Sequence, residues 1–269
     1  MRKLLFLLLM GSAGACHKPA KTNSNKAIPI ENWIRRTIHI KVNPIPQAFI
    51  IEDSLLSFQP FSGNLVGFKI KKDSLFIGEW QRFKIIELTA DSLIISGLLS
   101  PKNNIDTLKF SRLTTKNSVT PLKILFASSG CFGECPSMQL QIDSSGKFNF
   151  YGGEFTGKKG GFSGQLNPQQ YQKIVDKVRL LSIDELKGKY ETSTTDQQTM
   201  GIIIITKNRQ IESSAYGIDK EPVSLRLLFK ELSNLYKSVL LKPDSTINPY
   251  FLYPYDILKV PLPPKIDHR

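Results

Sequence analysis

A turn-and-strand motif that recurs through the first half of the chain constrains the fold more than any other feature of the sequence. Asp-Ser-Leu occurs at residues 53–55, 73–75 and 91–93, and Asp-Thr-Leu at 106–108 is a looser copy. Asp and Ser favour turns because their side chains bond nearby backbone groups, and the apolar residues that follow suit a half-buried strand. Successive copies are 20, 18 and 15 residues apart, which fits one hairpin each. The pattern predicts about seven or eight antiparallel strands over residues 30–113, an all-β meander that is barrel-like or strongly curled.

One segment within this predicted meander resembles a known type of domain. Residues 83–93, Phe-Lys-Ile-Ile-Glu-Leu-Thr-Ala-Asp-Ser-Leu, resemble a line found in lipocalin-like domains of secreted bacterial proteins. The resemblance implies a β domain that can enclose an apolar ligand, although a barrel of this size leaves little space once side chains fill its middle. Phe58, Phe68 and Trp80 are candidates to line such a cavity, and ordinary core is the alternative for all of them.

The first residues are typical of an export signal. Arg2 and Lys3 precede the apolar run 4–10, small residues fill 11–15, and Cys16 follows. Residues 13–16, Ala-Gly-Ala-Cys, resemble a bacterial lipobox, in which the peptidase cuts before a cysteine that carries a diacylglyceryl thioether. We therefore expect a signal peptide over residues 1–15, a lipidated Cys16 and a polar tether to residue 29. A plain secretory signal with an incidental Cys16 is the alternative.

The charge balance bears on partners more than on chemistry. The formal net charge is +13 at pH 7, which favours acidic partners. The expected partners are the membrane through lipidated Cys16, anionic envelope components, or another envelope protein. Nucleic acid is not expected, because the lysines are scattered among acids and the signal directs the chain to the cell envelope. We expect attachment to the outer membrane, on a face that the sequence leaves open.

A polar break at residues 114–120 separates the meander from a region of mixed periodicity. Alternation predicts strands on both sides of the turn at 143–146 and a hairpin over 202–216. Asn167 is a good N-cap and Pro168 suits the first position of a helix, which continues to Leu181. A second amphipathic helix is predicted over 225–235. The order predicts an α+β C-terminal domain, an antiparallel sheet with two helices on one face.

The most specific line of the sequence is Cys-Phe-Gly-Glu-Cys-Pro at residues 131–136. It is followed by a strand, a Gly-rich hairpin, Tyr190 and the pair Thr195-Asp196. This series resembles the family known as domain of unknown function 6438, over residues 121–240. The resemblance implies an extracytoplasmic, often lipid-anchored setting and no assigned activity. It makes the following residues a candidate functional loop: Phe132, Gly133, Glu134, Pro136, Tyr190, Thr195 and Asp196.

The two cysteines of that line offer two chemistries. In an oxidising envelope compartment exposed thiols are expected to pair, so Cys131 and Cys135 are predicted to form a structural disulfide, with Gly133 allowing the loop to bend. Thiol redox catalysis is the alternative, but redox motifs space their cysteines by two residues at a helix N-terminus. A zinc site would want four ligands, and His39 and His268 are distant in sequence. We expect no metal and no cofactor.

No catalytic residue is assigned from the sequence. The histidines are His17, His39 and His268, and none stands beside a nucleophile motif. Carboxylate chemistry would fall to Glu185, Glu191 and Asp196, although a Thr-Asp pair is more often part of a turn. The basic, Gly-rich residues 157–161 lack the spacing of a phosphate-binding loop.

The last part of the chain, residues 241–269, contains many prolines and is predicted to be an extended strap packed on one of the domains. A segment that binds a partner protein is the alternative for it. The whole sequence thus predicts a lipid-anchored envelope protein that acts as a non-catalytic binding or structural module. An envelope enzyme that uses thiols or carboxylates is the alternative.

Overall fold

A computed structural model describes residues 33–35, 48–52, 55–57, 66–77, 81–97, 106–217, 220–252 and 257–258. The export signal, Cys16, the tether, Phe58, Trp80, all three histidines and the side chain of Phe68 lie outside the described residues, so the predictions that concern them stay predictions. Among the described helices, none is long and apolar enough to cross a membrane.

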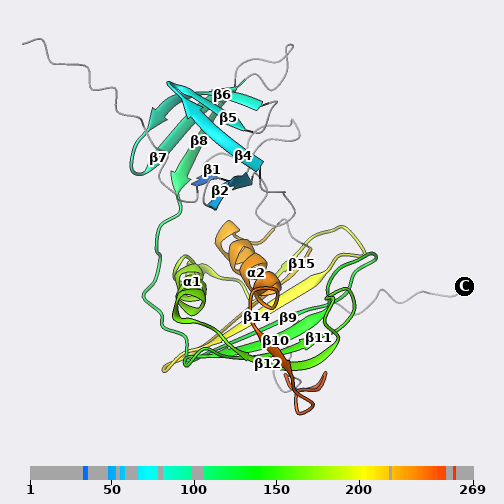
Figure 1. Ribbon diagram of the computed structural model, residues 1–269. Coiled ribbons are helices and arrows are strands. Elements are labelled where there is room, and N and C mark those ends of the chain that lie inside the picture. Colours follow the sequence, from blue (N-terminus) through cyan, green and yellow to red (C-terminus); the bar gives the residue numbers. More distant parts are fainter. Residues whose placement is uncertain are drawn as a thin grey trace, which may run out of the picture.

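The first half is a meander of short antiparallel strands (Figure 1). Each strand pairs with the next, and β1 also pairs with β8. The strands are β1 (Trp33–Arg35), β2 (Ala48–Glu52), β3 (Leu55–Ser57), β4 (Val66–Lys71), β5 (Ser74–Ile77), β6 (Gln81–Leu88), β7 (Ser92–Gly97) and β8 (Asp106–Arg112). Every copy of the Asp-Ser/Thr-Leu motif opens a strand, namely β3, β5, β7 or β8. The predicted all-β meander is confirmed.

The second half is a sheet with two helices on one face, as predicted, but the sheet is not antiparallel throughout. In chain order it contains β9 (Lys123–Ser128), β10 (Met138–Asp143), β11 (Lys147–Gly152), β12 (Gly160–Gln165), α1 (Pro168–Arg179), a 3-10 turn η1 (Ile183–Glu185), β13 (Lys189–Glu191), β14 (Thr199–Ile205), β15 (Gln210–Tyr216), α2 (Val223–Leu235) and β16 (Leu241–Pro243). The strand order is β13-β15-β14-β9-β10-β11-β12-β16. Only the short β13 runs parallel to its neighbour, β15, and the pattern of the sequence indicated neither edge strand.

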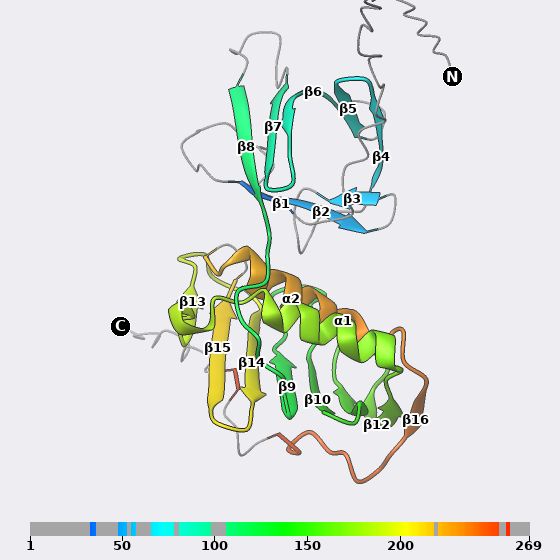
Figure 2. The ribbon, with the colours of Figure 1, turned by 90° about the vertical axis from the view of Figure 1, so that its left-hand side faces the viewer.

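Both helices cover the same face of this sheet (Figure 2). Asn167 caps α1 as expected: its side chain accepts from the backbone N–H of Gln170, and the Gln170 side chain accepts from the backbone of Asn167. Ile174 and Val178 of α1 and Leu228 and Leu232 of α2 are fully buried against the inner residues of the strands. Because every second residue of β10 and β11 points to this layer, the sheet has one apolar core face.

The opposite face of the sheet is crossed by the C-terminal segment, which we call the strap (the described residues 241–252 and 257–258). It begins as β16, which pairs with β12. Further on, Leu252 and Ile257 of the strap pack on Leu125 and Ile203 of the sheet. The Gln139 side chain donates to the carbonyl of Pro249 at 2.7 Å. The second face of the sheet is therefore partly covered by the chain itself.

Candidate functional site

The cysteine line forms the loop between β9 and β10. Cys131 and Cys135 are joined by a disulfide, with 5.5 Å between their Cα atoms, as predicted from their spacing and expected compartment. Gly133 has φ +152°, a backbone conformation that L side chains rarely adopt. The loop joins two strands and has no helix at either end, so the helix dipole that activates redox thiols is missing here.

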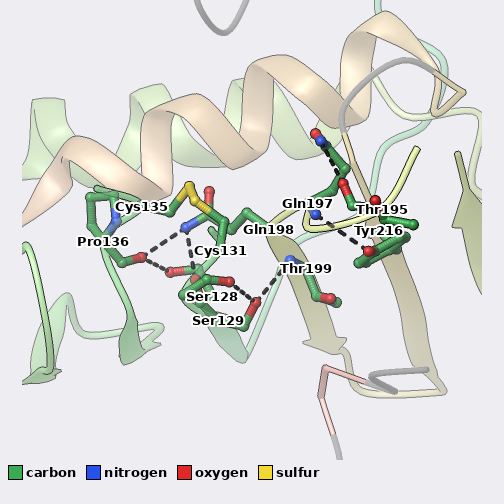
Figure 3. The surroundings of a disulfide bond; sticks show 11 residues. Ser128, Ser129, Cys131, Cys135, Pro136, Thr195, Gln197, Gln198, Thr199 and Tyr216 are labelled. Atoms are coloured by element: carbon green, nitrogen blue, oxygen red, sulfur yellow. Dashed lines mark hydrogen bonds between the residues drawn. A yellow bond between two sulfur atoms is a disulfide. The ribbon is translucent and has the colours of Figure 1, made fainter. Parts of the chain in front are cut away.

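A single buried amide holds both ends of this loop (Figure 3). The Gln198 side chain donates to the carbonyl of Ser129 at 2.9 Å and to the carbonyl of Pro136 at 2.8 Å. The hydroxyl of Ser128 donates to the same Pro136 carbonyl at 2.7 Å. Gln198 is 9% exposed, so these bonds are shielded from water and losing one would leave a buried polar group unsatisfied.

A second pair of contacts extends the ladder between β9 and β14 into the loop. The backbone N–H of Ser129 donates to the carbonyl of Thr199 at 2.9 Å. In return, the backbone N–H of Thr199 donates to the Ser129 hydroxyl at 2.9 Å. The hydroxyl in turn donates to the carbonyl of Gly130 at 2.7 Å. These bonds fix the direction in which the chain leaves the sheet.

The segment 192–198 lies beside the cysteine loop. The backbone N–H of Phe132 donates to the carbonyl of Asp196 at 3.2 Å, and the hydroxyl of Tyr216 accepts from the backbone N–H of Gln197 at 3.3 Å. Asp196 has φ 61°, a left-handed conformation in which Asp is better tolerated than most residues. Asp196 thus meets the cysteine loop through its backbone carbonyl.

The hairpin between β11 and β12 flanks the loop on its other side. The backbone of Ser137 exchanges hydrogen bonds with Gly153 and Glu154, and the Ser137 hydroxyl accepts from the Glu154 N–H at 2.9 Å. Phe155 follows with φ 58° and is 53% exposed. Three loops therefore meet at one end of the sheet. We call this set of segments, residues 129–137, 153–156 and 192–198, the clamped end.

The remaining predicted site residues are placed as follows. Thr195 lies in the clamped end, where its hydroxyl contacts the Asp196 carboxylate at 3.3 Å. Tyr190 lies on β13, against the main core, and its hydroxyl accepts from the N–H of Lys187 at 3.0 Å. Glu191 pairs with Lys189 at 2.5 Å, and Glu185 ends the η1 turn. Within the described ranges, no group of three or more His, Cys, Asp or Glu side chains could hold a metal ion.

Sequence reasoning missed the residues that hold the clamped end together. Ser128, Ser129, Gln198 and Tyr216 provide its hydrogen bonds, yet none belongs to the motif line. No local pattern marks them, because the partners of Gln198 are 69 and 62 residues away in the chain. The sequence analysis selected Asp196, which lies in the same segment as Gln198 but two residues before it.

Comparison with known proteins gives one family match, in the second half of the chain. Residues 122–236 match the model of a domain of unknown function, DUF6438. The matched residues lie within the C-terminal domain, which we therefore call the DUF6438 domain. The match begins with β9 and ends just after α2, so it covers the clamped end and the helix layer of the DUF6438 domain but not the meander or the strap. A search of curated proteins gave no match.

The geometry of this DUF6438 domain determines what its clamped end can do. Its buried polar side chains bond the backbone of its own loops, and its sulfurs bond each other. Phe132, at the tip of the cysteine loop, is 90% exposed. A fixed loop that presents an aromatic side chain to solvent is suited to contact another molecule, because little conformational entropy is lost when it binds.

Proposed function

We propose that this chain is an exported, lipid-anchored protein of the cell envelope whose DUF6438 domain binds another envelope protein through the clamped end. The observation that carries the proposal is the exposure of Phe132 on a loop whose backbone is fixed by a disulfide and by buried hydrogen bonds. Buried aromatic anchors contribute a large share of the energy of protein interfaces.

Burial of the exposed aromatic ring would favour binding at this place. Burying an exposed phenyl ring stabilises a complex by about 1.5–3 kcal/mol relative to leaving the ring in water. Holding it on a preorganised loop avoids most of the ordering cost when a partner covers it. Phe155, on the adjacent hairpin, is 53% exposed and adds a second apolar side chain at the same end of the sheet.

The setting is supported by the sequence and by the disulfide together. The basic start, the apolar run and Cys16 have the order of a lipoprotein signal. A disulfide persists in an oxidising compartment and is rare in a reducing one. Both features favour export, with attachment to the outer membrane as the proposed location.

Site-specific photocrosslinking in living cells tests the proposed interface. Phe132 is replaced by a photoreactive phenylalanine analogue in the full-length protein. The matched control carries the same analogue at Asn208, an exposed residue in the β14–β15 turn, which the antiparallel register places at the opposite end of the sheet. We expect a discrete crosslinked protein from position 132 and none from position 208. Equal products from both positions, or none from position 132, would contradict the proposal.

A further inference from the structure

Cationic side chains gather on one side of the meander. Each of the strands β4 to β8 pairs with the next (Figure 2), and side chains alternate between the two sides of a strand. On one side the residues are apolar and buried, namely Leu75, Phe83, Leu93, Ile95, Leu108 and Phe110. The other side carries five exposed cations, Lys69, Lys71, Arg82, Lys84 and Lys109. We call the side chains of β4–β8 on this second side the basic face.

Two cations of the basic face share one aromatic ring. Lys69 of β4 and Arg82 of β6 are both register partners of Phe76 on β5. The Nζ atom of Lys69 lies 6.0 Å from the centre of the Phe76 ring, and the Cζ atom of Arg82 lies 5.4 Å from it. Because the ring attracts both cations, it holds two like charges side by side.

A second row of the basic face adds two more charges next to the first row. Lys71 of β4 and Lys84 of β6 both pair with Ser74 of β5. Arg82 donates to the Ser74 hydroxyl at 3.3 Å, which joins the two rows. Neighbouring strands are about 4.8 Å apart, so the backbones of Lys71 and Lys84 are about 10 Å apart. This separation is close to the Debye length of about 8–10 Å, so the charges act together.

The acidic side chains of this region do not neutralise the basic face. Within the described part of the chain, none of its five cations forms an ion pair. Glu87 is the acid of β6, and Asp73 and Asp91 lie in the turns that bound the strands. Lys72 stands beside Asp73 in the same turn and offsets its charge. The face therefore keeps an excess of positive charge, which favours an anionic surface as its partner.

The basic face also exposes an apolar side chain. The register between β6 and β7 shifts between Ile85 and Glu87, and a bulge of this kind leaves one extra residue, here Ile86, outside the pairing. Ile86 is 56% exposed. Apolar side chains enter the headgroup region of a bilayer, whereas cations bind its anionic headgroups. An exposed isoleucine among cations suits that interface.

We propose that the basic face of the meander binds the surface of an anionic membrane. Its charges are spread over several strands, which fits a broad charged surface better than one small ligand. The proposed tether ends at residue 29, and the first described strand, β1, begins at Trp33. A lipid at Cys16 would therefore hold the meander near the bilayer and raise its effective concentration there.

This proposal rests on the membrane setting of the proposed function, but not on its partner contact. The test below uses protein without a lipid. Failure to bind vesicles would therefore leave both lipid attachment at Cys16 and the crosslink from position 132 intact. Conversely, loss of that crosslink would leave vesicle binding intact, so the two ideas fail separately.

Vesicle flotation measures the binding. The protein consists of residues 16–269 with Cys16→Ala, which is the chain that the proposed cleavage leaves, without its lipid. The vesicles are phosphatidylcholine with or without phosphatidylglycerol. A parallel arm measures binding to soluble polyglutamate at the same ionic strength, because an acidic protein is the other partner that a basic face could take.

The variants separate the charge of the basic face from the charge of the whole chain. The test variant combines Lys71→Gln and Lys84→Gln, and a second variant replaces the same two lysines by arginine and so keeps the charge. The matched control combines Lys207→Gln and Lys242→Gln, which remove two charges at exposed positions in the second half of the chain. The tether is the same in every variant.

We expect binding only to vesicles that contain phosphatidylglycerol, and loss of binding in about 1 M salt, where the Debye length is about 3 Å. One cation near an anionic bilayer strengthens binding about fivefold. The glutamine pair should therefore weaken binding about tenfold or more, while the arginine pair and the control bind as the original protein does. Equal binding to vesicles without phosphatidylglycerol, no vesicle binding, or equal weakening in the test and control variants would overturn the proposal. Binding to polyglutamate but to no vesicle would also overturn it, in favour of an acidic protein.

Discussion

Two residues of the clamped end have left-handed backbone conformations, which cost free energy. Phe155 has φ 58° and Asp196 has φ 61°. The left-handed region costs an L residue roughly 1–2 kcal/mol, and less for Asp, whose short side chain bonds locally. Asp196 makes such a local bond, because its carboxylate accepts from the Thr195 hydroxyl at 3.3 Å. The backbone conformation and this local bond therefore explain the Thr-Asp pair at residues 195–196. The explanation does not require a catalytic carboxylate.

Substitutions at Asp196 are predicted to lower stability according to how poorly the new residue adopts a positive φ. Asp196→Gly is expected to stay within about 0.5 kcal/mol of the original protein or to exceed it, because glycine adopts positive φ without strain. Asp196→Val is expected to lose about 1–2 kcal/mol, because a β-branched residue is disfavoured there. The free energy of unfolding from urea titration measures both. If the valine variant proves as stable as the glycine variant, the structural role is wrong.

At the scale of the elements, the two faces of the C-terminal sheet differ in how they are covered. One face is covered by α1 and α2, and the other is crossed by the strap. The strap approaches closely because Gly161 and Gly201 have no side chain. A Cβ atom at either position would overlap a backbone carbonyl of the strap, at Ile247 or at Ile257. These glycines are thus required by packing, with no need for positive φ.

Gly201→Ala is predicted to loosen the strap. The added methyl group overlaps the Ile257 carbonyl, so the protein is expected to lose about 1–3 kcal/mol of stability. The segment after residue 244 should become sensitive to protease. Gly188→Ala is the matched control, because a Cβ there meets nothing within 4 Å. Equal proteolysis and equal stability of both variants would show that the strap does not pack as described.

The sequence predicted those parts of the fold that depend on local signals. The Asn167 cap, the Pro168 start and the spacing of Ile174 and Val178 were sufficient for α1. The short edge strands β13 and β16 escaped detection, because three residues carry no period and their partners are distant in sequence. For the same reason the cysteine line could be recognised as a candidate site, whereas Gln198, which ties both ends of that loop, could not.

At the scale of the whole molecule, two β-rich parts follow one another along the chain. Leu113, just after β8, packs against Leu227 of α2. The family match covers the C-terminal domain and stops short of the meander. In our proposal the N-terminal part connects that domain to the membrane.

Membrane attachment predicts a specific chemical label. Cells fed radiolabelled palmitate should incorporate it into the full-length protein, and Cys16→Ala should abolish the label, because Cys16 is the proposed site of lipidation. Cys131→Ala should keep the label, since that cysteine belongs to the loop. Equal labelling of the original and the Cys16→Ala protein would remove lipid anchoring at Cys16 from the account.

The account as a whole depends on the chemical state of the cysteine loop in the cell. A closed loop of this size contributes about 2 kcal/mol of stability and holds Phe132 outward, whereas free thiols would favour redox chemistry. The direct measurement is to block free thiols in intact cells before lysis and to analyse the peptide that contains both cysteines by mass spectrometry. We predict that Cys131 and Cys135 are recovered joined and unblocked. Recovery of both cysteines in blocked form would contradict the proposal that this loop serves recognition.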